Sequence, residues 1–180
     1  MPITQKPRER ILNAASKLFH TQGYNSTGIN QLILEAQVAK ATMYQHFKSK
    51  EELAIEYLSN RHVYWFEGLQ KFTKEENITK EKIISSFEYL IYMNKNEDFN
   101  GCAFLNILSE IKSKDTAILT IIQNHKSDLR AYFFNIITDK ELSDLVYLLF
   151  ESAIIESRLF KDNWPIHKSI NHITSLLKPK

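Results

Sequence analysis

Residues 27–50 read TGINQLILEAQVAKATMYQHFKSK, and this stretch predicts two short helices joined by a tight turn. In its first half, apolar residues recur with the i, i+3, i+4, i+7 spacing of a helix that packs on a neighbour: Ile29, Leu32, Ile33 and Ala36. Gln37 and Val38 interrupt this period. Met43 and Phe47, four residues apart, then form the inner side of a second short helix. We therefore expect a helical hairpin with one shared apolar side.

The outward side of the second helix is small and polar. A cation stands at its start, followed by short or polar side chains: Lys40, Ala41, Thr42, Tyr44, Gln45 and His46. A helix of this composition suits insertion into the major groove of DNA. The same spacing also fits an ordinary hairpin with a solvated face, and spacing alone leaves both interpretations open.

The full string resembles the helix-turn-helix of the TetR family of transcriptional regulators. The shared features are Thr27 at the start of the first helix, Val38 in the turn, the run ATMY at 41–44 and the run HFKSKEEL at 46–53. Further on, a GCAF segment at 101–104 and a His-Lys pair at 125–126 also resemble some members. This resemblance implies a three-helix DNA-binding head, followed by a helical body that binds a small molecule and dimerises.

The resemblance also implies roles for the residues of the head. Phosphate contacts are expected from Thr27, Tyr44, His46 and Lys50. Base-edge contacts are expected from Lys40, Ala41, Thr42 and Gln45, because Lys can donate to guanine, Gln can pair with adenine and methyl groups can touch thymine. Thr27 is further expected to cap its helix through its hydroxyl.

Two positions depart from the family pattern. Gln37 stands where the family usually has Gly, and a left-handed backbone there would cost ~1 kcal/mol. Ala39 lacks the hydroxyl with which Ser would cap the second helix, a loss of roughly 1 kcal/mol. Neither change removes a DNA contact, but together they predict a head that is less rigid before it binds.

Composition indicates a folded, mostly helical protein. The 180 residues are 43% hydrophobic and 24% charged, and contain only four Gly and four Pro. Residues 1–50 carry seven basic and two acidic groups, whereas the remaining residues carry 16 basic and 19 acidic groups. This asymmetry is typical of a DNA-reading lobe joined to a sensing lobe, although sampling noise in a short window is the alternative. We expect an all-α fold of about nine helices, with a DNA-binding domain at 1–50 and a ligand-binding and dimerisation domain at 51–180.

Local signals place several of the later helices. Ser49 is expected to cap a helix, Asp139 to start another, and Pro165 suits the first turn of the last helix. Gly101-Cys102 is expected to begin a short helix, and Asp115 a long one.

The last two helices, expected at 139–160 and 165–177, are candidates for a dimer interface. The first of them is apolar nearly all round, so it needs cover both from its own core and from a partner. A fully buried helix within a monomer is the alternative. A homodimer would match the two halves of a near-palindromic operator in double-stranded DNA.

The aromatic residues of the body predict an apolar cavity for a largely apolar effector, although packing accounts for most of them. The candidate ligand-binding residues are Arg61, His62, Trp65, Cys102, Asn106, Glu110 and His125. Effector binding would release the operator, which makes repression the expected function.

Cys102 supports an alternative. A lone thiol at a helix start is a candidate oxidant or electrophile sensor, but cysteine is also a common small buried residue. An enzyme and a protein-binding adaptor are further alternatives; no HExxH motif, nucleophile elbow or metal-spaced cluster supports catalysis. We expect no cofactor and no metal, no membrane span, and a cytoplasmic location consistent with a single cysteine.

Overall fold

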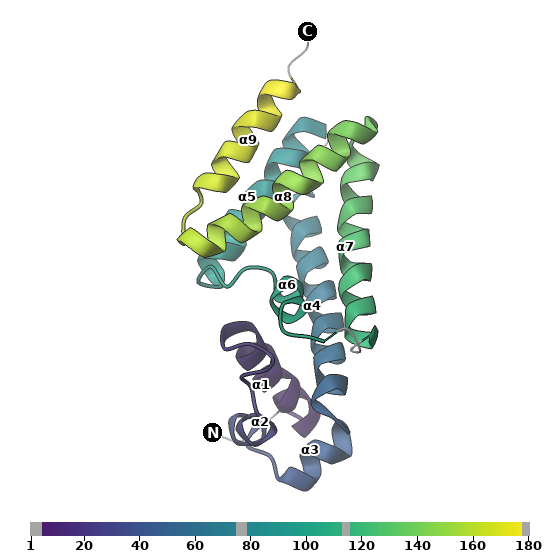
Figure 1. The fold of residues 1–180 in the computed structure, drawn as a ribbon, viewed down its shortest axis with the longest axis vertical. Coiled ribbons are helices and arrows are strands. Elements are labelled where there is room, and N and C mark those ends of the chain that lie inside the picture. The colour runs from purple at the N-terminus through teal and green to yellow at the C-terminus, as the bar shows by residue number, and fades with distance from the viewer. Residues whose placement is uncertain (1–4, 75–78, 113–115, 178–180) are drawn as a thin grey trace. The chain divides into compact units, whose positions relative to one another are not determined.

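The computed structural model describes residues 5–74, 79–112 and 116–177, and these residues form nine helices without strands (Figure 1). The predicted all-α fold of about nine helices is confirmed. None of the helices in these ranges is both long enough and apolar enough to cross a membrane.

The chain divides into two compact units. We call Met1–Val63 with Ala103–Gln123 the head unit, and Tyr64–Cys102 with Asn124–Lys180 the body unit. Helices α4 (Lys50–Phe72) and α7 (Thr116–Ile136) each contribute residues to both units. This division does not coincide with the boundary after residue 50, which remains a prediction about function.

The head unit contains α1 (Pro7–Thr21), α2 (Ile29–Ala36), α3 (Lys40–His46) and α6 (Ala103–Leu108), together with the first part of α4. Helix α1 contacts α2, α3 and α6. Its inner side and the facing helices supply fully buried residues: Ile11, Phe19, Leu32, Met43, Phe47, Leu53 and Leu58. The apolar spacing of the sequence thus becomes a three-helix core that fixes α3.

In the body unit, α5 (Thr79–Asn96), α8 (Lys140–Phe160) and α9 (Trp164–Leu176) pack together. Aromatic side chains dominate the core, which includes Trp65, Phe87, Tyr89, Phe133 and Phe150. Large rings bury much apolar area each, so this interior is tightly occupied.

The local signals placed most helix starts correctly. The carboxylate of Asp139 accepts a hydrogen bond from the Leu142 N–H at 2.9 Å, the Ser49 hydroxyl accepts one from the Glu52 N–H at 3.0 Å, and Pro165 lies in the first turn of α9. The predicted helix start at Gly101-Cys102 is wrong. Gly101 has a φ of +72°, which is incompatible with a right-handed helix, so α6 begins only at Ala103. The predicted start at Asp115 lies outside the described residues.

Candidate DNA-binding and effector sites

Helix α3 turns different side chains to its two sides. Met43 and Phe47 are 0% and 1% exposed, and they anchor the helix in the core of the head unit. The opposite side carries the exposed members of the predicted set: Lys40, Ala41, Tyr44 and Gln45. Thr42 and His46 are half-buried at its edges. Six of the predicted DNA-contacting residues therefore share one accessible helix.

The turn between α2 and α3 has the predicted left-handed residue. Gln37 has φ 52° and ψ 48°, a conformation that disfavours a residue with a Cβ. The guanidinium of Arg10 donates to the Gln37 carbonyl at 2.9 Å and so supports the turn from α1. Ala39 precedes α3 without a side-chain capping bond, as predicted.

Thr27 departs from prediction. The N-cap of α2 is Gly28, and the buried Thr27 hydroxyl donates to the Gly23 carbonyl at 2.7 Å. The predicted cap is therefore wrong, because the hydroxyl bonds backward into the loop. With its side chain fully buried, Thr27 presents no hydroxyl to a phosphate in this conformation.

Lys50 is also held inward. Its ammonium donates to the carbonyls of Tyr24 at 3.0 Å and Thr27 at 3.2 Å, and lies 4.3 Å from the centre of the Tyr24 ring. Burial lowers the pKa of Lys50, while the negative charge of Glu110 opposes that effect. These partners hold the ammonium toward the loop, and the phosphate contact of Lys50 stays a prediction.

Lys48 was not among the predicted contacts, yet its side chain is exposed just after α3. Its backbone N–H donates to the Glu52 carboxylate at 2.7 Å, which joins the end of α3 to the start of α4. Its charge and its place directly after the buried Phe47 could have suggested Lys48 as a further cation of this run.

Comparison with known proteins places this geometry in a family. Residues 11–57 match the model of "Bacterial regulatory proteins, tetR family". The chain is 41% identical over 83 residues to the transcriptional regulator LmrA of Bacillus subtilis, which is 38% of this chain and 44% of LmrA. It is 32% identical over 75 residues to the regulator QacR of Staphylococcus aureus, covering 42% of this chain and 40% of QacR. Each match spans less than half of the relative.

A solved structure extends the similarity beyond the head. A protein of Streptomyces avermitilis, described as a TetR transcriptional regulator, has 27% identity and a TM-score of 0.82, covering 96% of this chain and 98% of its own. Residues 11–57 thus belong to the TetR family, and the chain has the fold of a solved TetR regulator.

The predicted effector residues of the chain fall into both units. Arg61, His62, Asn106 and Glu110 belong to the head unit, whereas Trp65, Cys102 and His125 belong to the body unit. Within the body unit, the rings of Trp65 and His125 meet edge to face with centres 5.7 Å apart. The structure therefore brings these two predicted residues together.

Glu110 contacts the loop before α2, and its effector contact stays a prediction. Its carboxylate accepts hydrogen bonds from the backbone N–H groups of Tyr24 and Asn25, at 3.1 and 2.6 Å. The Asn25 side chain donates in return to the Glu110 carbonyl at 2.7 Å. Its side chain is thus committed to the loop before α2. No local pattern in the sequence indicates this contact, because the partners are 85 and 86 positions apart.

Aromatic rings fill the body interior, where the sequence predicted a cavity. The Trp65 ring contacts Tyr89 at 5.5 Å and Phe150 at 6.2 Å between centres. The Tyr89 hydroxyl donates to the Trp65 carbonyl at 3.2 Å and lies over Gly68, where a Cβ would approach it to 2.2 Å. An effector in this region would therefore have to displace side chains of the core.

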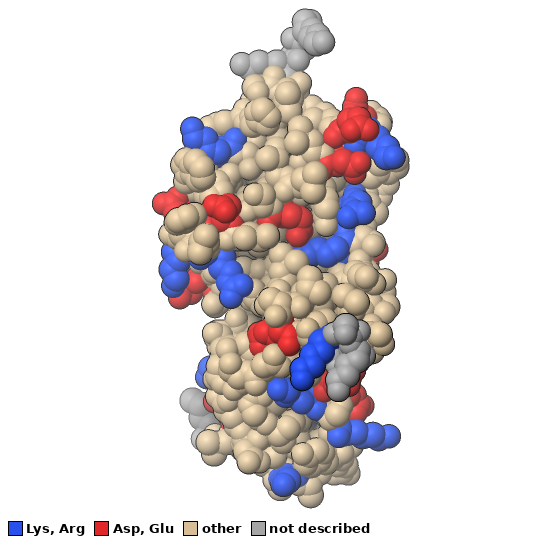
Figure 2. Space-filling view, in the orientation of Figure 1, with Lys and Arg blue, Asp and Glu red and all other residues tan. Residues whose placement is uncertain are grey.

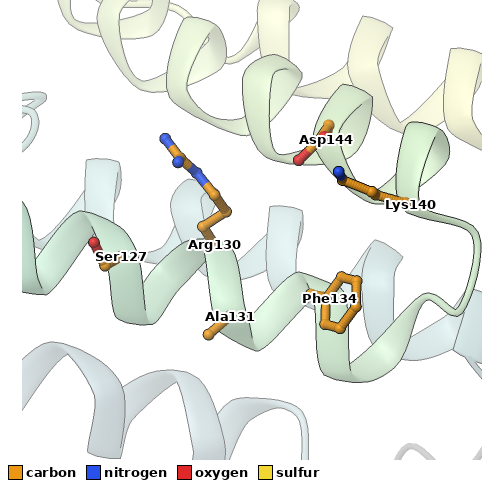
Figure 3. A pocket seen from close by; sticks show the side chains of 6 residues that line it. All are labelled: Ser127, Arg130, Ala131, Phe134, Lys140 and Asp144. Carbon is orange, nitrogen blue, oxygen red and sulfur yellow. The ribbon is translucent and has the colours of Figure 1, made fainter.

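A surface pocket of about 320 Å³ lies between α7 and α8 (Figure 3). Its lining residues are Ser127, Arg130, Ala131, Phe134, Lys140 and Asp144. In Figure 3 the side chains of Arg130 and Asp144 project from the two helices toward the space between them. None of the predicted effector residues lines this pocket.

Cys102 lies beside a buried ion pair. The Lys126 ammonium is 3.5 Å from the Cys102 sulfur and 2.6 and 2.8 Å from the two oxygens of Glu151. Burial, the largest influence, lowers the pKa of Lys126, but the charges of Cys102 and Glu151 together raise it above its usual value. Sequence inspection gave no reason to pair Lys126 with Glu151, since the two residues lie on different helices.

Proposed function

We propose that this TetR-family chain is a DNA-binding transcriptional repressor that acts as a homodimer and releases its operator when a largely apolar effector binds the body. The observation that carries the proposal is the two-sided α3, with Met43 and Phe47 buried and a polar opposite face. Such a helix can enter the major groove without exposing apolar core residues.

Within this proposal, some residues of α3 would contact base edges and others would contact phosphates. Lys40 and Gln45 are the candidates for hydrogen bonds to base edges, with methyl contacts from Ala41. Tyr44 and His46 would contact phosphates, and Lys48 would replace Lys50 as the cation beyond α3. The free N–H groups at the start of α2 add an anion site.

The outward face of α8 supports a second copy of the chain as partner. Val146, Phe150 and Ala153 are buried on its inner side, whereas its outer side exposes a stripe of apolar residues: Leu145, Leu148, Ile155 and Leu159, at 37%, 61%, 53% and 68%. Uncharged side chains cover most of the surface over α8 and α9 in Figure 2. An apolar stripe of this kind is typical of an interface that a partner covers.

The DNA-binding proposal is tested with duplex DNA from upstream of the protein's own gene, by fluorescence anisotropy over a salt series. We expect log affinity to fall linearly with log salt, as phosphate contacts release counterions. Tyr44→Ala should weaken binding about tenfold or more, because a hydrogen bond to a charged group is lost at the interface. Tyr92→Ala is the matched control, since Tyr92 is 49% exposed in the body unit. Equal affinities for both variants would contradict the site.

The dimer proposal is tested by placing charge on the α8 stripe. Leu148→Glu with Ile155→Glu should convert the protein to monomers in sedimentation experiments, because four carboxylates would lie unpaired in a dimer interface. Operator affinity should fall at least hundredfold, toward that of one half-site. Phe134→Glu changes an equally exposed residue, 55%, outside the stripe. If the doubly charged variant sediments like the control, the interface lies elsewhere.

The effector proposal predicts a change at Trp65. Coupling between effector and operator should be about 1–3 kcal/mol, typical of two-state regulators. In a Trp164→Phe protein, Trp65 is the remaining tryptophan, so its fluorescence reports on the body core. Compounds that shift this fluorescence should weaken operator binding. An operator affinity that stays unchanged across such compounds would refute the switch.

A second candidate function rests on the Lys126–Cys102 contact. The Lys126 ammonium lies 3.5 Å from the Cys102 sulfur, and this sulfur, as a thiolate, would attack hydrogen peroxide to give a sulfenic acid and hydroxide. If Cys102 is the sensor, peroxide should weaken operator binding of the native protein and leave Cys102→Ala unaffected. A peroxide response that persists in Cys102→Ala would exclude it.

A further inference from the structure

A single carboxylate holds the loop that leads into α2. The two oxygens of Glu110 accept from two successive backbone N–H groups, those of Tyr24 at 3.1 Å and Asn25 at 2.6 Å. The Asn25 side chain donates to the Glu110 carbonyl at 2.7 Å. Three hydrogen bonds thus join residues 24–25 to one residue just beyond α6, all within the head unit.

The loop is shaped for this carboxylate. Gly23 has a φ of +101°, which turns the following amides toward a common point, as in other anion-binding concavities of the backbone. A Cβ on Gly23 would lie 2.8 Å from Oε1 of Glu110, so the close approach requires glycine. The fit of loop and carboxylate is therefore specific in shape as well as in charge.

A cation completes the arrangement from the carbonyl side of the same loop. The Lys50 ammonium donates to the Tyr24 carbonyl at 3.0 Å and to the Thr27 carbonyl at 3.2 Å. Gly28, the N-cap of α2, follows directly. Glu110 and Lys50 together determine where the first free N–H groups of α2 are placed.

We infer that Glu110 is a positioning residue for DNA binding: through the loop at 23–27 it places the start of α2, and with it the amides that would meet a phosphate. The inference rests on the proposed DNA-binding function. It makes residues 103–110 part of the DNA-reading unit. Glu110 itself makes no DNA contact in this account, because its carboxylate is hydrogen-bonded to the loop.

The test compares operator affinity and its salt dependence for the full-length native protein and four variants: Glu110→Ala, Asn25→Ala, both together, and Glu88→Ala. Glu88 is an exposed glutamate on α5 and serves as the matched control. Asn25 is exposed, so its replacement leaves the core intact if Glu110→Ala proves poorly folded. Melting temperature and the fraction of protein able to bind are measured for each.

Without these bonds the amides at the start of α2 would no longer be held where they can meet a phosphate, so one contact would be weakened. Glu110→Ala should therefore bind about tenfold more weakly and Asn25→Ala about threefold, and the double variant should be no worse than Glu110→Ala, since all three bonds act as one unit. The salt slope should become shallower by about one phosphate contact. Amide exchange at residues 24 and 25 should accelerate.

Failure of the inference differs from failure of the proposed function. If the native protein binds no DNA tested in a salt-dependent way, the proposed function fails. If the native protein binds and Glu110→Ala binds as tightly as Glu88→Ala, the positioning role is refuted. A smaller active fraction with an unchanged salt slope would also refute it, because that result indicates general unfolding.

Discussion

The head and body units hold their inward-facing charges in different ways. In the head unit, Lys50 and Glu110 bond to backbone carbonyl and amide groups of one loop. In the body unit, Lys126 bonds to the carboxylate of Glu151. The first arrangement fixes the path of the backbone, whereas the second neutralises two side chains between helices.

The pKa values of the two lysines accordingly shift in opposite directions. Burial dominates at Lys50 and lowers its pKa, with only partial opposition from Glu110. Burial is also the largest influence at Lys126, but the charges of Cys102 and Glu151 outweigh it and raise the pKa. Carbonyl groups can hold a cation in place without carrying a full negative charge. The body pair should therefore matter more for stability, and the head contacts more for the path of the backbone.

The largest expected effect comes from breaking the body pair. Lys126→Met should reduce the free energy of unfolding by about 3–5 kcal/mol, because Glu151 is left buried without its partner. Chemical denaturation at neutral pH measures the change. Lys126→Met with Glu151→Gln should recover part of the loss, since no unpaired charge remains. If Lys126→Met were as stable as the native protein, the body pair would not contribute more to stability than the head contacts.

The same pair predicts a response to alkali. The folded-state pKa of Lys126 is raised, so its contribution to stability is complete below its unfolded value of 10.5 and is lost as pH rises through the folded value. Comparing the denaturation of native and Lys126→Met proteins between pH 9 and strongly alkaline pH would reveal a narrowing difference.

A smaller effect is expected from Lys50→Met. The loss of two hydrogen bonds to carbonyls should cost about 1–2 kcal/mol of unfolding free energy. Lys48→Met is the matched control, because that side chain is exposed; it should leave stability unchanged and make the salt slope of DNA binding shallower by about one. If Lys50→Met behaved like Lys48→Met, Lys50 would be a phosphate ligand after all.

The smallest effect concerns the turn at Gln37. Gln37→Gly should stabilise the head by about 0.5 kcal/mol, because relief of left-handed strain exceeds the extra entropy of glycine in the unfolded chain. Gln70→Gly in the last turn of α4 should destabilise by about 0.5 kcal/mol, which makes it the control. Thermal denaturation distinguishes the two, and a destabilised Gln37→Gly would mean that Arg10 already offsets the strain.

Local features of the sequence predicted most of the fold and one side of the DNA site. The spacing of Met43 and Phe47 assigned the buried side of α3, and Asp139 and Ser49 marked helix starts, because each signal depends on neighbours within one helical turn. The left-handed residue at Gln37 was predictable for the same reason.

Local patterns did not indicate side chains that bond backward into a loop or to residues far along the chain. Thr27 bonds backward to Gly23, and Lys50 reaches 23 and 26 positions along the chain to its carbonyl partners. Glu110 was assigned to an effector because its residue type and approximate place suited one. Its partners at 24 and 25 become visible only in three dimensions.

The bonds of Glu110 bear on the construction of chimaeric regulators, in which the reading head of one protein is fused to the sensor of another. A junction after residue 50 would retain every exposed residue of α3 but would discard the carboxylate that holds residues 24 and 25. The donor sensor would need a glutamate at the corresponding place after its own short helix, where it could approach Gly23 of the head. Grafting residues 103–110 together with the head would retain the contact between Glu110 and residues 24–25. The transplanted head would then keep its backbone conformation as well as its DNA-contacting side chains.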